Sequence, residues 1–101
     1  MNNALNAYQK QAVLNATPEE LISLVYDGTI AATYRKDQPK LLEGLQILIH
    51  ALNFDYEPAQ NFYNVYQYCR YKGQQNEFEE VREILGGIRD AWNEHVLNRK
   101  K

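Results

Sequence analysis

The sequence contains few residues that bind metals or form covalent links. Among its 101 residues are one cysteine and two histidines, Cys69, His50 and His95. A single cysteine cannot form a disulfide within the chain, which fits a reducing compartment such as the cytoplasm. Zinc needs three or four ligands, and no pair of these residues has the spacing of a zinc site. The Glu-x-x-His motif of di-iron bundles is absent as well, so we expect no metal and no cofactor.

Long apolar runs and a surplus of positive charge are also missing. No apolar stretch approaches the roughly 20 residues that a membrane-spanning helix needs, and residues 1–7 lack the basic and apolar regions of a signal peptide. The formal net charge is −2, and the one basic cluster is the tail 99–101, whereas a nucleic-acid-binding domain usually carries a basic face. We therefore expect a cytoplasmic protein that inserts into no membrane and binds no nucleic acid.

Signs of catalysis are weak. The sequence has no glycine-rich phosphate-binding loop. Cys69 falls on the predicted interior stripe of its helix, where a thiol is inert, so a nucleophilic Cys–His pair is the weaker interpretation. His95 lies at the edge of an apolar face, where packing explains it better than ligand binding does. We predict no catalytic residue and no enzymatic activity.

The strongest positive signal is the stretch Thr17 to Gly28, TPEELISLVYDG. Thr17 is a residue type that caps a helix N-terminus, and Pro18 suits the first helical position. Glu20, three residues after Thr17, completes a capping box. The stripe of this helix that is expected to face the core consists of Leu21, Leu24, Val25, Gly28 and Ala32.

Ile22, Tyr26 and Ile30 form a second apolar stripe on the same helix. The simpler interpretation is a helix with neighbours on two sides, as in any bundle. The alternative is a groove that accepts a helix from another chain.

Three further amphipathic stretches follow, and the predicted helices span about 18–34, 39–53, 58–72 and 77–98. Gly73 is expected to end the third helix and Asn76 to cap the fourth. Gly86 and Gly87 interrupt the fourth, where either another chain approaches closely or the helix bends. Short connections make consecutive helices antiparallel. We therefore predict an all-α fold, an up-down-up-down four-helix bundle that forms a single domain.

Tyrosine is abundant, with eight tyrosines against three phenylalanines and one tryptophan, and this residue is enriched at binding surfaces. Tyr68 and Tyr71 are predicted on the outer side of the third helix, where they are candidates for an interface. Residues 1–16 are expected to form an N-terminal arm that docks through Tyr8, Val13 and Leu14. A frayed terminus is the alternative.

The residues from Ala7 to Ile30, AYQKQAVLNATPEELISLVYDGTI, resemble the N-terminal signature of the FliS family of flagellar secretion chaperones. The shared features are an alanine-tyrosine pair, a short apolar patch, Thr-Pro-Glu and a closing Tyr-Asp-Gly. Three later segments stand in the family's order: LNFD at 52–55, NFYNVYQYCR at 61–70 and EVREILGGIRDAW at 80–92. The resemblance covers nearly the whole chain. It departs in two shorter connections, 28–52 and 70–78, whose turns lie at the same end of the expected bundle.

The resemblance implies a cytoplasmic chaperone that binds the disordered C-terminal segment of flagellin and prevents premature polymerisation. Contacts with the export apparatus or with regulatory proteins are implied as well, and a homodimer stays open. The arm is expected to occupy part of a groove until the client displaces it. The expected client-binding residues are Tyr8, Val13, Leu14, Ile22, Tyr26, Ile30, Ile47, Tyr68 and Tyr71. The alternative function is a non-enzymatic helical adaptor or a self-associating structural bundle with a different protein client.

Overall fold

The computed structural model describes residues 15–97. Within that range the chain forms only helices: α2 (Pro18–Arg35), α3 (Gln38–His50), α4 (Ala59–Gln74), α5 (Phe78–Trp92) and the π-helix η1 (Asn93–Leu97). The second of these helices ends three residues earlier than the expected 39–53. The last expected helix, 77–98, is divided, because its final turn has π geometry.

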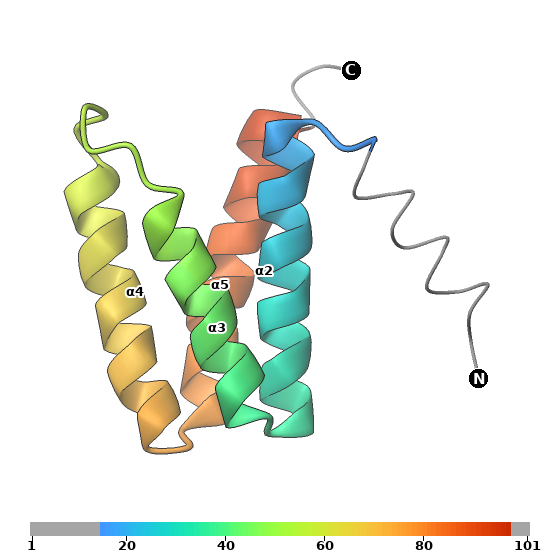
Figure 1. Ribbon diagram of the computed structural model, residues 1–101, viewed down its shortest axis with the longest axis vertical. Coiled ribbons are helices and arrows are strands. Elements are labelled where there is room, and N and C mark those ends of the chain that lie inside the picture. The colour runs from blue at the N-terminus through green and yellow to red at the C-terminus, as the bar shows by residue number, and fades with distance from the viewer. Residues whose placement is uncertain (1–14, 98–101) are drawn as a thin grey trace.

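The helices pack as a bundle in which each α-helix contacts two others. The contacting pairs are α2 with α3, α2 with α5, α3 with α4, and α4 with α5. Figure 1 shows the α2–α3 and α4–α5 turns at one end and the α3–α4 connection at the other. Toward the α3–α4 connection, α3 and α4 diverge from α2 and α5 (Figure 1). The bundle is therefore closed at one end and splayed at the other.

The beginning of α2 confirms the predicted capping box. The Thr17 hydroxyl accepts a hydrogen bond from the Glu20 backbone N–H at 3.1 Å, and the Glu20 carboxylate accepts one from the Thr17 N–H at 2.9 Å. Two backbone donors that the helix leaves without partners are thereby satisfied. The start of α2 is thus encoded by four consecutive residues.

The predicted signals at the α4–α5 turn are wrong. Gly73 lies inside α4 without a positive φ, and a Cβ there would lie 2.9 Å from Cδ2 of Leu41, so its small size serves the contact with α3. Asn76 adopts the left-handed φ of 61° and its side-chain oxygen accepts from Gln38 Nε2 at 3.1 Å. It therefore does not cap α5, whose N-cap position is taken by Glu77 without a side-chain hydrogen bond.

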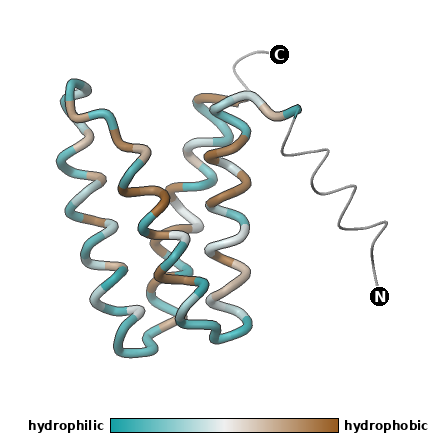
Figure 2. Tube along the Cα trace, viewed as in Figure 1, coloured by the Kyte–Doolittle hydropathy of each residue, from teal (hydrophilic) through white to brown (hydrophobic). Residues whose placement is uncertain are grey.

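The core lies between the four helices and draws unequally on them. Leu41, Leu45 and Leu48 of α3 and Val81 and Leu85 of α5 are almost fully buried. Most of α4 is hydrophilic (Figure 2), and its buried side chains are Ala59, Tyr66 and Cys69. Because α4 offers little apolar surface, it packs less completely than the other helices do.

Both apolar stripes of α2 contribute to the core, in agreement with the simpler interpretation of a helix with neighbours on two sides. In the first stripe Ala32 is 0% exposed, but Leu21 is 36% and Leu24 42% exposed. In the second stripe Tyr26 is 3% and Ile30 7% exposed, and Ile22 is partly buried. Helical period fixes which residues share a face but not which face turns inward. The inward face of α2 is suited to burial because its polar groups are satisfied: the hydroxyls of Thr29 and Thr33 donate to backbone carbonyls of the same helix at 2.6 Å.

Candidate functional site

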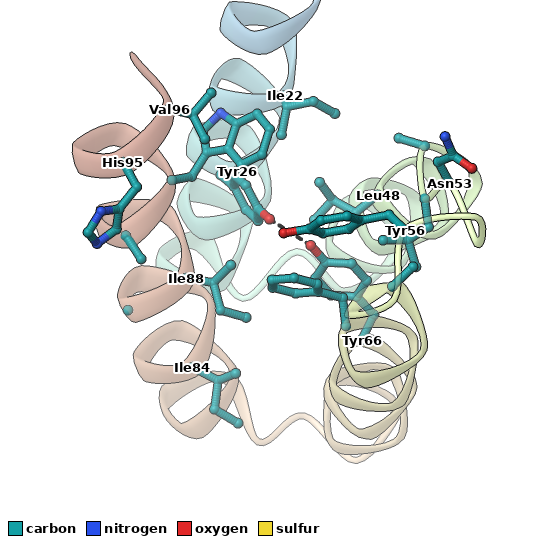
Figure 3. A pocket seen from close by; sticks show the side chains of 17 residues that line it. Ile22, Tyr26, Leu48, Asn53, Tyr56, Tyr66, Ile84, Ile88, His95 and Val96 are labelled. Atoms are coloured by element: carbon teal, nitrogen blue, oxygen red, sulfur yellow. Dashed lines mark hydrogen bonds between the residues drawn. The ribbon is translucent and has the colours of Figure 1, made fainter. Parts of the chain in front are cut away.

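The splayed end of the bundle contains an apolar groove with a volume of about 730 Å³. One wall is formed by α5 and η1, and the other by the end of α3, the α3–α4 connection and the start of α4. Figure 3 shows Ile84 and Ile88 on one side, facing Tyr66 and Leu48 across the opening, with Ile22 and Tyr26 of α2 at the back. We call this feature the groove.

The α5–η1 wall is a continuous helical stripe. Its residues recur every three or four positions: Ile84, Gly87, Ile88, Ala91, Trp92, His95 and Val96. At 1.5 Å per residue the stripe is about 18 Å long. Trp92 is fixed at the α2 side of this wall, because its indole N–H donates to the Glu19 carbonyl at 3.0 Å. The wall is thus long enough to contact about three turns of another helix.

The opposite wall combines aliphatic and aromatic side chains from three consecutive segments. They are Leu48 of α3, Ala51, Leu52, Asn53 and Tyr56 of the connection, and Ala59, Phe62 and Tyr66 of α4. Phe62 and Tyr66 stack with their ring centroids 6.2 Å apart. This arrangement gives the groove an aromatic side opposite the aliphatic stripe of α5.

Tyr26 and Tyr66 join the two halves of the bundle at the back of the groove. Their hydroxyl oxygens lie 2.6 Å apart in a hydrogen bond, and each side chain is 3% exposed. Burial raises the pKa of both phenols, so both stay protonated at neutral pH. We call these two residues the tyrosine pair. One hydroxyl donates and the other accepts, and among residues 15–97 no buried side-chain nitrogen or oxygen lacks a hydrogen-bond partner.

The groove is lined mainly by apolar side chains. Its non-tyrosine polar side chains are Asn53 and His95, which lie at its periphery in Figure 3. Among residues 15–97, no group of three or more His, Cys, Asp or Glu side chains is placed to hold a metal ion. Cys69 is fully buried in the core, and burial raises the pKa of its thiol to about 12. The groove offers apolar contact area instead of reactive groups.

The structure brings two of the predicted client-binding residues to the groove. Ile22 and Tyr26 line it, whereas Ile30 is buried in the core outside it. The predicted arm residues Tyr8, Val13 and Leu14 lie outside the described range.

The remaining three predicted residues are at the surface and do not line the groove. Ile47 is 47% exposed on α3. Tyr68 and Tyr71 are exposed on α4, as predicted, and the Tyr68 hydroxyl donates to the Glu80 carboxylate. The Tyr68 side chain is thus engaged within the chain, while Ile47 and Tyr71 are open to solvent.

Sequence reasoning missed most of the groove. None of the predicted client-binding residues is on α5, although Ile84, Gly87, Ile88, Ala91 and Trp92 of that helix line the groove. The available signal was that α5 has two overlapping apolar faces, one of which contains small residues four positions apart. The contribution of the α3–α4 connection had no such signal, because it depends on how α3 and α4 diverge.

Comparison of the chain with protein-family models, with curated proteins and with solved structures gives no match in any of the three. Within residues 15–97, no helix combines the length and the hydrophobicity that crossing a membrane requires.

Proposed function

We propose that this chain is a flagellin export chaperone of the FliS type. In this proposal an up-down-up-down bundle with an N-terminal arm binds the disordered C-terminal segment of flagellin in the cytoplasm. The client folds into a helix in the groove, which keeps its polymerisation surface covered until export. The chaperone needs no catalytic residue and no cofactor, because masking requires only binding.

The groove is the observation that carries the proposal. Fully burying one Leu, Ile, Val or Phe side chain contributes about 1.5–3 kcal/mol. A client helix along the α5 wall places about three or four such side chains in contact, for a gross gain of about 4.5–12 kcal/mol. Ordering a disordered segment costs about 2–5 kcal/mol. The groove is therefore large enough to fold a client as it binds.

The two connections that are shorter than the family pattern lie differently with respect to this site. Residues 70–78 span the α4–α5 turn at the closed end of the bundle (Figure 1), away from the groove. The connection 28–52 contains the α2–α3 turn at the same end, but it also contains α3 and Leu48, Ala51 and Leu52 of the groove wall. The groove of this chain is present with both connections at their shorter length.

A peptide of the flagellin C-terminal segment tests the proposal. We expect titration with the peptide to increase helicity measured by far-ultraviolet circular dichroism and to give a saturable binding isotherm. Ile88→Asn, in the groove wall, should weaken binding at least tenfold. Ile47→Asn is the matched control, because Ile47 is exposed and outside the groove, and it should leave binding within about twofold. Thermal melting of each variant establishes that it is folded.

A wild-type protein that is folded but binds no flagellin peptide would rule out this function. Equal losses of affinity in the two variants would instead place the client on the outer surface, because Ile47 is one of the exposed residues that are predicted from the sequence to bind the client.

Self-association is the second candidate, and a separate surface favours it. Leu21 and Leu24 of α2 and Ile47 of α3 are large apolar residues with more than a third of their surface exposed. Since α2 and α3 are in contact, these residues provide apolar area that a second copy can cover. Size-exclusion chromatography of the wild type and of Leu24→Lys tests this: a dimer that the lysine converts to a monomer supports it, and a wild-type monomer excludes it.

A further inference from the structure

Carboxylates border the groove on two sides. On α5, Glu83 and Asp90 lie four residues before and three residues after Gly87, and Glu94 of η1 lies three residues after Ala91. Residues at these spacings are neighbours on a helix surface, so the three carboxylates follow the edge of the apolar stripe. Asp55 and Glu57 flank Tyr56 in the α3–α4 connection. All five side chains are exposed.

These carboxylates are mostly unmatched by positive charge. Within residues 15–97, Glu83, Glu94, Asp55 and Glu57 have no ion pair within 4 Å. Asp90 is paired with Arg89 at 3.2 Å, and that arginine also contacts Asp27 of α2. Of the lysines and arginines in the described range, none lines the groove. The entrance to an apolar site is thus negatively charged.

Gly87 lets an occupant come close to this charged edge. A Cβ built at Gly87 would meet no atom within 4 Å, so no neighbour among the described residues requires a glycine there. Ala91 is the next residue along the same face. Two small side chains four residues apart allow a second helix to pack at short interaxial distance. The residues that flank the contact face of that helix then lie near the carboxylates of α5.

We propose that the groove accepts an amphipathic helix whose apolar stripe is bordered by lysine or arginine side chains. The inference rests on the proposed function, in which the groove binds a helix, and it specifies the charge of that helix. The apolar stripe fills the groove, and the basic residues pair with Glu83, Asp90 and Glu94 on one side and Asp55 and Glu57 on the other. Because the carboxylates are exposed, they set the preferred charge and direction of the partner more than its total affinity.

Three synthetic helical peptides with one apolar stripe test the proposal. They differ only at the flanking positions, which are lysine, glutamine or glutamate. Binding to the full-length chain is measured by fluorescence anisotropy at about 0.01 M and about 1 M salt, where the Debye length falls from about 30 Å to about 3 Å. We expect the lysine peptide to bind about five- to tenfold tighter than the glutamine peptide at low salt and the glutamate peptide to bind weakest. The differences should shrink below about twofold at high salt.

A double variant assigns the effect to the groove edge. Glu83→Gln combined with Glu94→Gln should remove most of the preference for lysine and leave the affinity for the glutamine peptide unchanged. The matched control is Glu43→Gln, an exposed carboxylate of α3 that pairs with Lys40 at 3.5 Å and does not line the groove. It should leave the preference unchanged.

The outcomes separate this inference from the proposed function. If all three peptides bind equally at low salt, or if the preference for lysine survives in the double variant, the charge assignment is overturned while helix binding stands. If no peptide binds and the flagellin segment also fails to bind, both proposals are overturned.

Discussion

The tyrosine pair makes a thermodynamic prediction that follows from its geometry. Replacing one tyrosine by phenylalanine removes one hydroxyl and leaves the other buried without its partner. An unsatisfied buried hydroxyl costs about 1–3 kcal/mol. We therefore expect Tyr26→Phe and Tyr66→Phe each to lower the free energy of unfolding by about 1–3 kcal/mol.

The double variant behaves differently because it removes both hydroxyls. No buried polar group then remains unpaired, and the two rings keep their apolar contacts. We expect the double variant to lie within about 1 kcal/mol of the wild type, since replacing both partners by apolar groups of similar shape is nearly neutral. Independent effects would instead add to about 2–6 kcal/mol. The coupling energy should thus be nearly as large as the sum of the two single-variant losses.

Urea unfolding of the four proteins, followed by far-ultraviolet circular dichroism at neutral pH, measures the cycle. The slopes against urea should agree among the four, which shows that stability and not compactness has changed. For a domain of this size, a loss of about 1 kcal/mol lowers the melting temperature by about 4–8 °C. A double variant that loses the sum of the two single losses would refute the reasoning, because it would mean that each hydroxyl has its own partner.

Three further predictions concern the glycines, the pH dependence and the thiol. Gly86→Ala should raise the free energy of unfolding by about 1 kcal/mol, since a Cβ there meets open space. Gly44→Ala should lower the free energy of unfolding by about 1–3 kcal/mol, because the Cβ would collide with Thr29. Urea unfolding that gives both changes the same sign would contradict the packing at these two glycines. The free energy of unfolding should be constant up to about pH 9 and fall above it by up to about 1.4 kcal/mol per pH unit for each group whose pKa is raised in the folded state. The fall begins as the thiol of Cys69 (ordinary pKa 9.0) ionises in the unfolded chain, and above about pH 10 the tyrosine pair (ordinary pKa 10.0) adds to it. A stability that is flat up to pH 11.5 (about 2.5 units above the ordinary thiol pKa) would show that these groups ionise equally in both states. Cys69 should react with an aromatic disulfide reagent only as fast as the bundle opens, so subdenaturing urea should accelerate the reaction, and a rate equal to that of a free thiol would contradict its burial.

The features of the fold that could be predicted from sequence are those set by local contacts. The capping box of Thr17 and Glu20 depends on four consecutive residues, and it forms as predicted. The burial of Cys69 follows from its position on an apolar stripe. The capping box requires no knowledge of how the helices are placed, because residue type and sequence spacing determine it.

The errors arise where a contact between helices decides the outcome. Gly73 was expected as a helix stop, but the approach of Leu41 gives its small size another use. The exposure of Leu21 and Leu24 and the deeper burial of Tyr26 were not predicted, because the partner that makes burial of Tyr26 favourable lies 40 residues away, on α4. A groove was the alternative interpretation of the second stripe of α2; Ile22 and Tyr26 line the groove of the structure, whereas Ile30, Ile47, Tyr68 and Tyr71 do not. Nothing local specifies that α3 and α4 diverge from α2 and α5.

Polar contacts explain why the groove stays open at one end. At the groove end, α5 and η1 are held to α2, since Trp92 donates to the Glu19 carbonyl at 3.0 Å and Ser23 donates to Asn93 at 2.9 Å. At the other end α3 is held to α4, since the Gln38 amide donates to the carbonyls of Gly73 and Gln74 at 3.0 and 3.1 Å.

The bundle therefore consists of two helix pairs that are joined firmly at the closed end and, near the groove, through the tyrosine pair. Closing the groove would require α4 to cover the α5 stripe, but α4 is mostly hydrophilic and has little apolar surface to gain from the movement. An apolar helix in the groove would contact both pairs at once and bury the surface that α4 leaves uncovered. Binding would then stabilise the bundle as well as the client, because a ligand that binds only the folded state shifts the unfolding equilibrium by mass action.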